Sequence, residues 1–173
     1  MTLSPSLNPK SKVLSKDIII EPSLNISARL YASISPALPP PTAGGDGSEA
    51  WLRNNVDFDP VYVSGDSVGG NIAHNMVVPA GLEETGRVKF RGLFLNCPHF
   101  WGNEQIGNES SDPEMVAREE SIWIHAYPNS TGFDDPLLNP DYNPNLSKLG
   151  RKKVVVYVAE YDILRERAIG KER

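Results

Sequence analysis

The fold of this chain is decided by one stretch, Val61-Tyr62-Val63-Ser64-Gly65-Asp66-Ser67-Val68-Gly69-Gly70-Asn71-Ile72-Ala73-His74. A β-branched and aromatic run stops at Gly65, and Ser67 follows two residues later. A segment compatible with a helix then begins at once, which predicts a strand, a sharp turn and a helix. The pattern Gly-x-Ser-x-Gly in that context is a nucleophile elbow, in which a strained turn presents the serine hydroxyl.

The residues around Ser67 complete the predicted elbow, and its other members are Gly65, Asp66, Gly69 and Gly70. Gly65 and Gly69 are expected where a Cβ would collide with the neighbouring strand or helix. The helix N-terminus offers unpaired N–H groups, first of all that of Val68, to a developing oxyanion. The alternative is an ordinary strand–helix turn, because glycine and serine are common turn residues.

Composition and charge exclude several classes of function. The 173 residues are enough for one domain with a core, and the net charge of −5 argues against nucleic acid or a membrane as a partner. The sequence contains neither a run of about 18 apolar residues, as a transmembrane helix requires, nor the apolar stretch of a signal peptide. Cys97 is the only cysteine, so we expect a cytoplasmic protein in which Cys97 is a small buried side chain.

The chain is expected to form a single incomplete domain over residues 1–173. Residues 1–16 are polar and rich in proline and serine, which predicts an irregular arm. Strands at residues 17–21 and 26–32 are expected to form an antiparallel hairpin. Residues 35–50 are predicted to be a Pro/Gly-rich linker, because the prolines and glycines there do not support a helix or a central strand.

The remainder alternates strands with helical segments, which is the pattern of an α/β fold with a mostly parallel sheet. The helix of the elbow should end before Pro79, and residues 88–96 are expected to form the next strand. Residues 98–145 are a long excursion or lid-like segment, with one amphipathic helix near residues 113–126. Residues 153–159 are a nearly continuous apolar run, typical of a parallel strand that is buried on both faces.

Asp162 is the second candidate catalytic residue. Catalytic groups of open α/β sheets gather at the carboxyl ends of the strands, and Asp162 follows its strand as Ser67 follows the elbow strand. The order serine then aspartate is that of an α/β-hydrolase triad, in which a histidine comes last. Position alone leaves two interpretations open, because acidic residues follow buried strands in many chains without any catalytic role.

Six phrases of the sequence carry a family resemblance. They are Ser15–Ile20, Ile26–Tyr31, Gly65–His74, Cys97–Gly102 with His99 where tyrosine is usual, Phe133–Pro140 with its Asp-Asp-Pro loop, and Ala159–Arg167. They resemble the plant carboxylesterases of the hormone-sensitive-lipase-like group, relatives of the gibberellin receptors. The resemblance covers nearly all of residues 15–168. It implies a serine esterase with Ser67 as the nucleophile and Asp162 as the triad aspartate.

The chain also departs from that family. The family has a His-Gly-Gly-Gly loop and its flanking strands where this chain has Pro36–Gly47. That loop supplies N–H groups to the oxyanion hole, so here only the Val68 N–H is expected. The family's triad histidine corresponds to a position beyond Arg173. The resemblance therefore implies a partial α/β-hydrolase fold that lacks the oxyanion-loop strands and the C-terminal strand and helix.

Three histidines remain as substitutes for the triad base. His74 is about two helical turns beyond Ser67, too far to reach its hydroxyl, and is expected to pack on a helix face. His125 lies in the excursion helix, at the surface or in a lid. His99 follows the strand next to the elbow, but a base there needs both reach to Ser67 and an orienting carboxylate.

Two functions follow. The first is a carboxylic-ester hydrolase by descent, acting on a small-molecule ester through an acyl-enzyme, with low or no activity as written, because loss of a triad histidine costs about 10⁶ in turnover. The alternative is a non-catalytic product, either a receptor-like binding protein or the remnant of an incomplete gene model. Neither a metal nor a cofactor is expected, since the sequence has no cysteine cluster, no histidine pair at ligand spacing and no phosphate loop.

Overall fold

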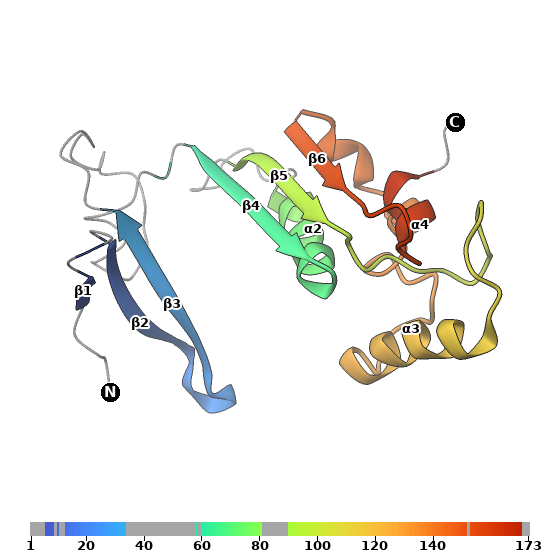
Figure 1. Cartoon of the computed structure of the whole chain (residues 1–173), viewed down its shortest axis with the longest axis horizontal. Coiled ribbons are helices and arrows are strands. Elements are labelled where there is room, and N and C mark those ends of the chain that lie inside the picture. The colour runs from blue at the N-terminus through green and yellow to red at the C-terminus, as the bar shows by residue number, and fades with distance from the viewer. Residues whose placement is uncertain are drawn as a thin grey trace. The chain divides into compact units, whose positions relative to one another are not determined.

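The computed structural model describes residues 6–8, 10, 13–33, 58, 60–80, 90–151 and 153–170 (Figure 1). The chain divides into two compact units, Met1–Phe58 and Asp59–Arg173, where the sequence predicts one domain. The linker predicted at residues 35–50 lies outside the described residues.

The N-terminal unit contains an antiparallel sheet in the order β1-β2-β3, formed by Ser6–Asn8, Val13–Glu21 and Ile26–Ser33. The hairpin of β2 and β3 is confirmed, and a 3-10 turn (η1, Pro22–Leu24) joins its strands. Asn25 adopts a left-handed φ of 54° there, a conformation that asparagine tolerates. The predicted irregular arm over residues 1–16 is wrong where β1 and the start of β2 lie, because cross-strand pairing overrides weak local propensity.

The second unit is built on a parallel sheet in the order β4-β5-β6, formed by Val61–Asp66, Phe90–Asn96 and Lys153–Tyr157 (Figure 1). Helix α2, Val68–Ala80, packs against β4 and β5. The mostly parallel α/β sheet with an N-terminal antiparallel hairpin is thus the predicted fold class. The 3-10 segments η2 and η3 span Pro140–Tyr142 and Leu146–Arg151, and the short helix α4 spans Arg165–Ile169.

The main core lies between α2 and β5. Leu93 and Leu95 alternate toward one face of the sheet, and they pack with Ala73, Val77 and Val78 of the helix. The sequence predicts that His74 packs on a face of this helix, and this role is confirmed. Its buried ring lies edge-on against Phe100, with the ring centroids 5.1 Å apart.

Helix α2 continues past the predicted end, and Pro79 lies inside it. Proline lacks the N–H that an interior helical position would use, but at the last turn only one such donor is lost. The sequence rule therefore placed the end of the helix two residues too early.

Strand β6 contradicts the prediction of a strand buried on both faces. All five of its residues are exposed, with Val155 at 54% and Tyr157 at 58%. Burial of both faces requires helices on both sides of a parallel sheet. Among the described residues, α2 covers β4 and β5, whereas β6 is the last strand of its sheet and has no strand beyond it.

The excursion over residues 98–145 is a packed part of the unit. It contains α3, Pro113–Ala126, where the sequence predicts a helix. Asp112 caps this helix by accepting a hydrogen bond of 3.0 Å from the Glu114 N–H, and proline fills its first position. A second core cluster joins the excursion to the chain before α4, and its members are Trp101, Trp123, Leu138 and Leu164.

A buried ion pair also ties the excursion to α4. Arg167 Nε lies 2.8 Å from Glu109 Oε1, and both side chains are almost fully buried. The same guanidinium donates to the carbonyl oxygen of Glu104. Because a buried charge is tolerated only when it is paired, this contact anchors α4 against the excursion.

Candidate active site

Ser67 lies at the turn between β4 and α2, in the conformation that a nucleophile elbow requires. Its φ is 51°, a left-handed value that few residues other than glycine adopt. The turn is held from both sides, because the Ser67 N–H donates to the Asn96 carbonyl oxygen at 3.0 Å and the Asn71 N–H donates to the Ser67 carbonyl oxygen at 3.2 Å. The Ser67 residue is exposed, so its hydroxyl is accessible to a ligand.

Two of the three elbow glycines have a steric reason. A Cβ on Gly65 would overlap the carbonyl group of Gly69, and a Cβ on Gly70 would lie 3.0 Å from the Pro98 Cβ. The same expectation for Gly69 is wrong, since a Cβ there would meet nothing within 4 Å. The Gly69 side of the helix faces open space, whereas Gly65 and Gly70 lie where strand, helix and the turn after β5 converge.

Asp66 has a role that the sequence did not reveal. Its carboxylate accepts a hydrogen bond of 2.5 Å from the Asn96 side chain, which joins the ends of β4 and β5. The Asn96 backbone at the same time holds the Ser67 N–H. Asp66 therefore fixes the strand from which the serine is presented.

The Val68 N–H is the predicted oxyanion donor. Val68 is the first residue of α2, and the first N–H groups of a helix have no partner within it. The structure records no acceptor for this N–H among the residues that it describes. An oxyanion on a carbonyl carbon bonded to Ser67 can therefore accept a hydrogen bond from this group.

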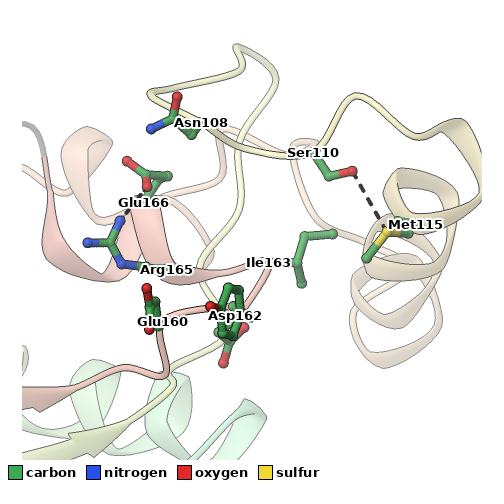
Figure 2. A pocket seen from close by; sticks show the side chains of 9 residues that line it. Asn108, Ser110, Met115, Glu160, Asp162, Ile163, Arg165 and Glu166 are labelled. Carbon is green, nitrogen blue, oxygen red and sulfur yellow. Dashed lines mark hydrogen bonds and ion pairs between the residues drawn. The ribbon is translucent and has the colours of Figure 1, made fainter.

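Asp162 lies on the loop after β6, at the same edge of the sheet as Ser67. Its side chain lines a cavity of about 450 Å³, together with Glu160 and Arg165. Figure 2 shows Asp162 beside Glu160. The Asp162 carboxylate accepts a hydrogen bond of 2.9 Å from the Leu164 N–H. This bond fixes the orientation of the carboxylate relative to the backbone that leads into α4.

Cys97 is the neighbour of Asp162 on the adjacent strand end. A hydrogen bond to the Asp162 carboxylate is the main reason that the pKa of the Cys97 thiol is raised above its ordinary value. The thiol therefore stays protonated and is a weak nucleophile. Cys97 is half-buried and has a φ of 41°, so the expectation of a simply buried side chain is only partly right.

His99 is the histidine nearest to the elbow in the backbone. Its backbone N–H donates to the Ser67 carbonyl oxygen at 2.9 Å, while its buried imidazole lies against helix α3. There, Nε2 lies 3.4 Å from Oε2 of the buried Glu119. Burial is the largest influence on the imidazole and lowers the pKa of His99, although the Glu119 carboxylate acts in the opposite direction. The structure thus supplies the orienting carboxylate, but it records no hydrogen bond between His99 and the Ser67 hydroxyl.

Glu119 is the residue that sequence reasoning missed. It lies one helical turn before Trp123, and these two are the buried residues of α3. A carboxylate at an i, i+4 spacing from a buried tryptophan was the available signal, because that spacing places both on one helix face. The remaining histidine, His125, is exposed in the last turn of α3. No group of three or more metal-ligating side chains occurs in the part of the chain that the structure describes.

Comparison with known proteins places this site in a family. Residues 33–171 match the family described as the alpha/beta hydrolase fold. The chain is 30% identical over 226 residues to probable carboxylesterase 2 of Arabidopsis thaliana, covering 94% of this chain and 72% of that protein. It is 38% identical over 125 residues to 2-hydroxyisoflavanone dehydratase of Glycine max, covering 70% of this chain and 39% of the relative. It is also 38% identical over 127 residues to the chloroplastic tuliposide A-converting enzyme 1 of Tulipa gesneriana, covering 72% of this chain and 32% of that enzyme.

This chain belongs to the alpha/beta hydrolase fold family, among the plant carboxylesterases. The alignment with the Arabidopsis protein is longer than this chain, so the aligned part of the relative contains residues that have no counterpart here. An internal deletion in this chain relative to the Arabidopsis protein produces such a difference in length. None of the helices among the described residues is both long and apolar enough to cross a lipid bilayer.

Proposed function

We propose that this chain is by descent a serine carboxylic-ester hydrolase, with Ser67 as its nucleophile, and that these 173 residues have low or no turnover. The observation that carries the proposal is the left-handed φ of 51° at Ser67, between a parallel strand and the first turn of a helix. Holding a serine in that conformation costs on the order of 1–3 kcal/mol. A serine whose only role was to turn the chain would have no reason to be there in place of glycine.

The reaction that this geometry supports begins with attack of the Ser67 oxygen on the acyl carbon of an ester. The serine proton passes to a base, and the carbonyl oxygen becomes an oxyanion that accepts a hydrogen bond from the Val68 N–H. Collapse of this intermediate breaks the bond to the alcohol oxygen, and the alcohol leaves with a proton. Water then attacks the acyl-enzyme and releases the carboxylic acid. Asp162 would orient the base in both halves of the cycle.

Low turnover follows from what surrounds Ser67. None of the three histidines is hydrogen-bonded to its hydroxyl, because His74 packs in the core, His99 faces Glu119 and His125 is exposed on α3. Loss of one oxyanion donor costs on the order of 10²–10³ in turnover, and a triad serine without a hydrogen-bonded histidine loses about 10⁶. The larger loss corresponds to roughly 8 kcal/mol of transition-state stabilisation.

Treatment with a fluorophosphonate probe tests the assignment of Ser67. The probe phosphonylates a serine that is presented and solvent-accessible, and peptide mass spectrometry locates the adduct. We expect slow modification at Ser67 that disappears in Ser67→Ala and persists in Ser64→Ala, a neighbouring exposed serine on β4. Absence of any adduct at Ser67 after prolonged reaction would overturn the assignment.

The second candidate is a non-catalytic binding protein of receptor-like type. The observation in its favour is that His99, which is directed at Glu119, leaves the Ser67 hydroxyl without a base. Hydrolysis of p-nitrophenyl acetate separates the two functions. A rate above the buffer rate that is lost in Ser67→Ala excludes the binding protein, and a rate equal to that of Ser67→Ala supports it.

A further inference from the structure

A second cavity, apart from the one at Asp162, lies between α2 and α3. Its volume is about 390 Å³, within the range of small-molecule sites. One end adjoins the elbow, because Val68 directly follows Ser67 and lines it. The larger apolar side chains of the wall are Val68, Ile72 and Met76 from α2, Ile122 and Trp123 from α3, and Tyr127 and Leu137 from the chain that follows α3.

The cavity is held open by hydrogen bonds beneath its surface. The side-chain amides of Asn71 and Asn75 both donate to the Leu137 carbonyl oxygen, at 2.8 and 2.7 Å. Asn71 also donates to the His99 carbonyl oxygen at 3.0 Å. These bonds tie α2 to the two loops that carry His99 and Leu137, which also line the cavity, so its shape exists before a ligand arrives.

The lining of the cavity selects against charge. None of the described residues that line it is lysine, arginine, aspartate or glutamate. Three apolar side chains of α2 that line it are more than one-third exposed, with Ile72 at 55% and Met76 at 57%. A water molecule, with its single non-hydrogen atom, occupies about 30 Å³ in the liquid. On that scale the cavity volume holds about a dozen non-hydrogen atoms. An aromatic bicycle with one polar substituent has that size and polarity.

We propose that the α2–α3 cavity binds an uncharged, mainly apolar group of about a dozen non-hydrogen atoms, and that this group is the apolar part of the ester presented to Ser67. The assignment of this group to the ester at Ser67 rests on the proposed function. Burial of the ligand against Ile72, Met76 and Ile122 removes apolar surface from water on both sides, which is the driving force for binding. The position of Val68 places the bound group within reach of the serine.

The methionines of the chain offer a direct readout. There are three, at positions 1, 76 and 115; Met76 lines the α2–α3 cavity, and Met115 lines the cavity of Asp162 shown in Figure 2. The experiment titrates 2-naphthol into ¹³C-methyl-methionine-labelled Ser67→Ala protein, which cannot form an acyl-enzyme. We expect a saturable shift of the Met76 methyl resonance through the ring current, with the Met115 resonance unchanged.

Two comparisons complete the test. Naphthalene-2-sulfonate has the same ring with a negative charge and should bind at least about tenfold more weakly, because no lysine or arginine is among the described residues of the wall. Ile72→Gln should raise the dissociation constant about fivefold or more, whereas Ile124→Gln, an equally exposed residue of α3 outside the cavity, should change it less than twofold. No saturable Met76 shift, equal affinity for the sulfonate or equal effects of the two variants would overturn the proposal. Because Ser67 is replaced throughout, failure here is distinct from failure of the fluorophosphonate reaction.

Discussion

The backbone N–H of His99 donates a hydrogen bond of 2.9 Å to the carbonyl oxygen of Ser67. The Ser67 N–H in turn donates to the carbonyl oxygen of Asn96, so the turn after β4 is joined both to the end of β5 and to the turn that follows it. This double link places the serine, whereas the His99 side chain is committed to Glu119 on α3. The elbow is thus assembled by backbone contacts that do not depend on a catalytic base.

The elbow glycines should respond very differently to alanine. Gly65→Ala forces a Cβ into the Gly69 carbonyl group and should lower the free energy of unfolding by about 3 kcal/mol. Gly69→Ala meets open space in the first turn of α2 and should raise that free energy by about 0.5 kcal/mol. Urea unfolding followed by tryptophan fluorescence measures both. Equal destabilisation by the two variants would contradict the geometry.

The buried ion pair predicts a large asymmetry between two arginines of α4. Arg167→Met leaves the Glu109 carboxylate buried without its partner and should cost about 3–5 kcal/mol of stability. Arg165→Met breaks the neighbouring pair with Glu166, which is more exposed, and should cost less than about 1 kcal/mol.

A double variant checks the cause of that loss. Glu109→Leu combined with Arg167→Met removes both charges, so the melting temperature should lie well above that of Arg167→Met alone. A double variant that is no more stable than the single one would show that the guanidinium acts through its backbone contacts with Gly102 and Glu104.

Stability should fall as the pH drops below about 6.5. Burial lowers the pKa of both His74 and His99 in the folded protein, so the unfolded chain binds protons first as the pH falls. Each histidine can therefore contribute up to about 1.4 kcal/mol per pH unit, between pH 6.5 and its folded pKa. Above pH 6.5 both states are neutral at these positions and the contribution vanishes.

A comparison of histidine variants measures this effect. His74→Phe preserves an aromatic ring against Phe100 and should flatten the dependence of the urea midpoint on pH between 5 and 7. His125→Phe, at an exposed position of α3, is the matched control. A slope in His74→Phe as steep as in the unmodified protein would show that the buried imidazole is not its source.

The thiol of Cys97 should become more reactive when Asp162 loses its charge. The hydrogen bond to the carboxylate raises the pKa of the thiol, so Asp162→Asn should lower that pKa and increase the thiolate fraction at pH 8. Alkylation by iodoacetamide should be about threefold faster or more, since one pKa unit corresponds to a tenfold change in thiolate well below the pKa. Asp141→Asn, an exposed acid of η2, is the control. An unchanged rate in Asp162→Asn would exclude the contact.

Much of the second unit could be predicted from local sequence. The turn at Ser67, the strands at β4 and β5 and helix α3 with its Asp112 cap depend on periodicity and capping within a few residues. The exposure of β6 could not be predicted, because a run of valines has the same appearance whether or not helices cover it. The end of α2 at Ala80 was missed for a smaller reason, since proline is tolerated where few donors remain.

The sequence by itself determined the family, the elbow and the residue that the elbow presents, because these follow from small residues and hydrophobic spacing in single segments. Only the tertiary structure decided which neighbours Ser67 has. It paired His99 with Glu119, Cys97 with Asp162 and Glu109 with Arg167. The physical reason is that these contacts join side chains from different elements, and packing of the sheet, α3 and α4 sets which of them are buried together.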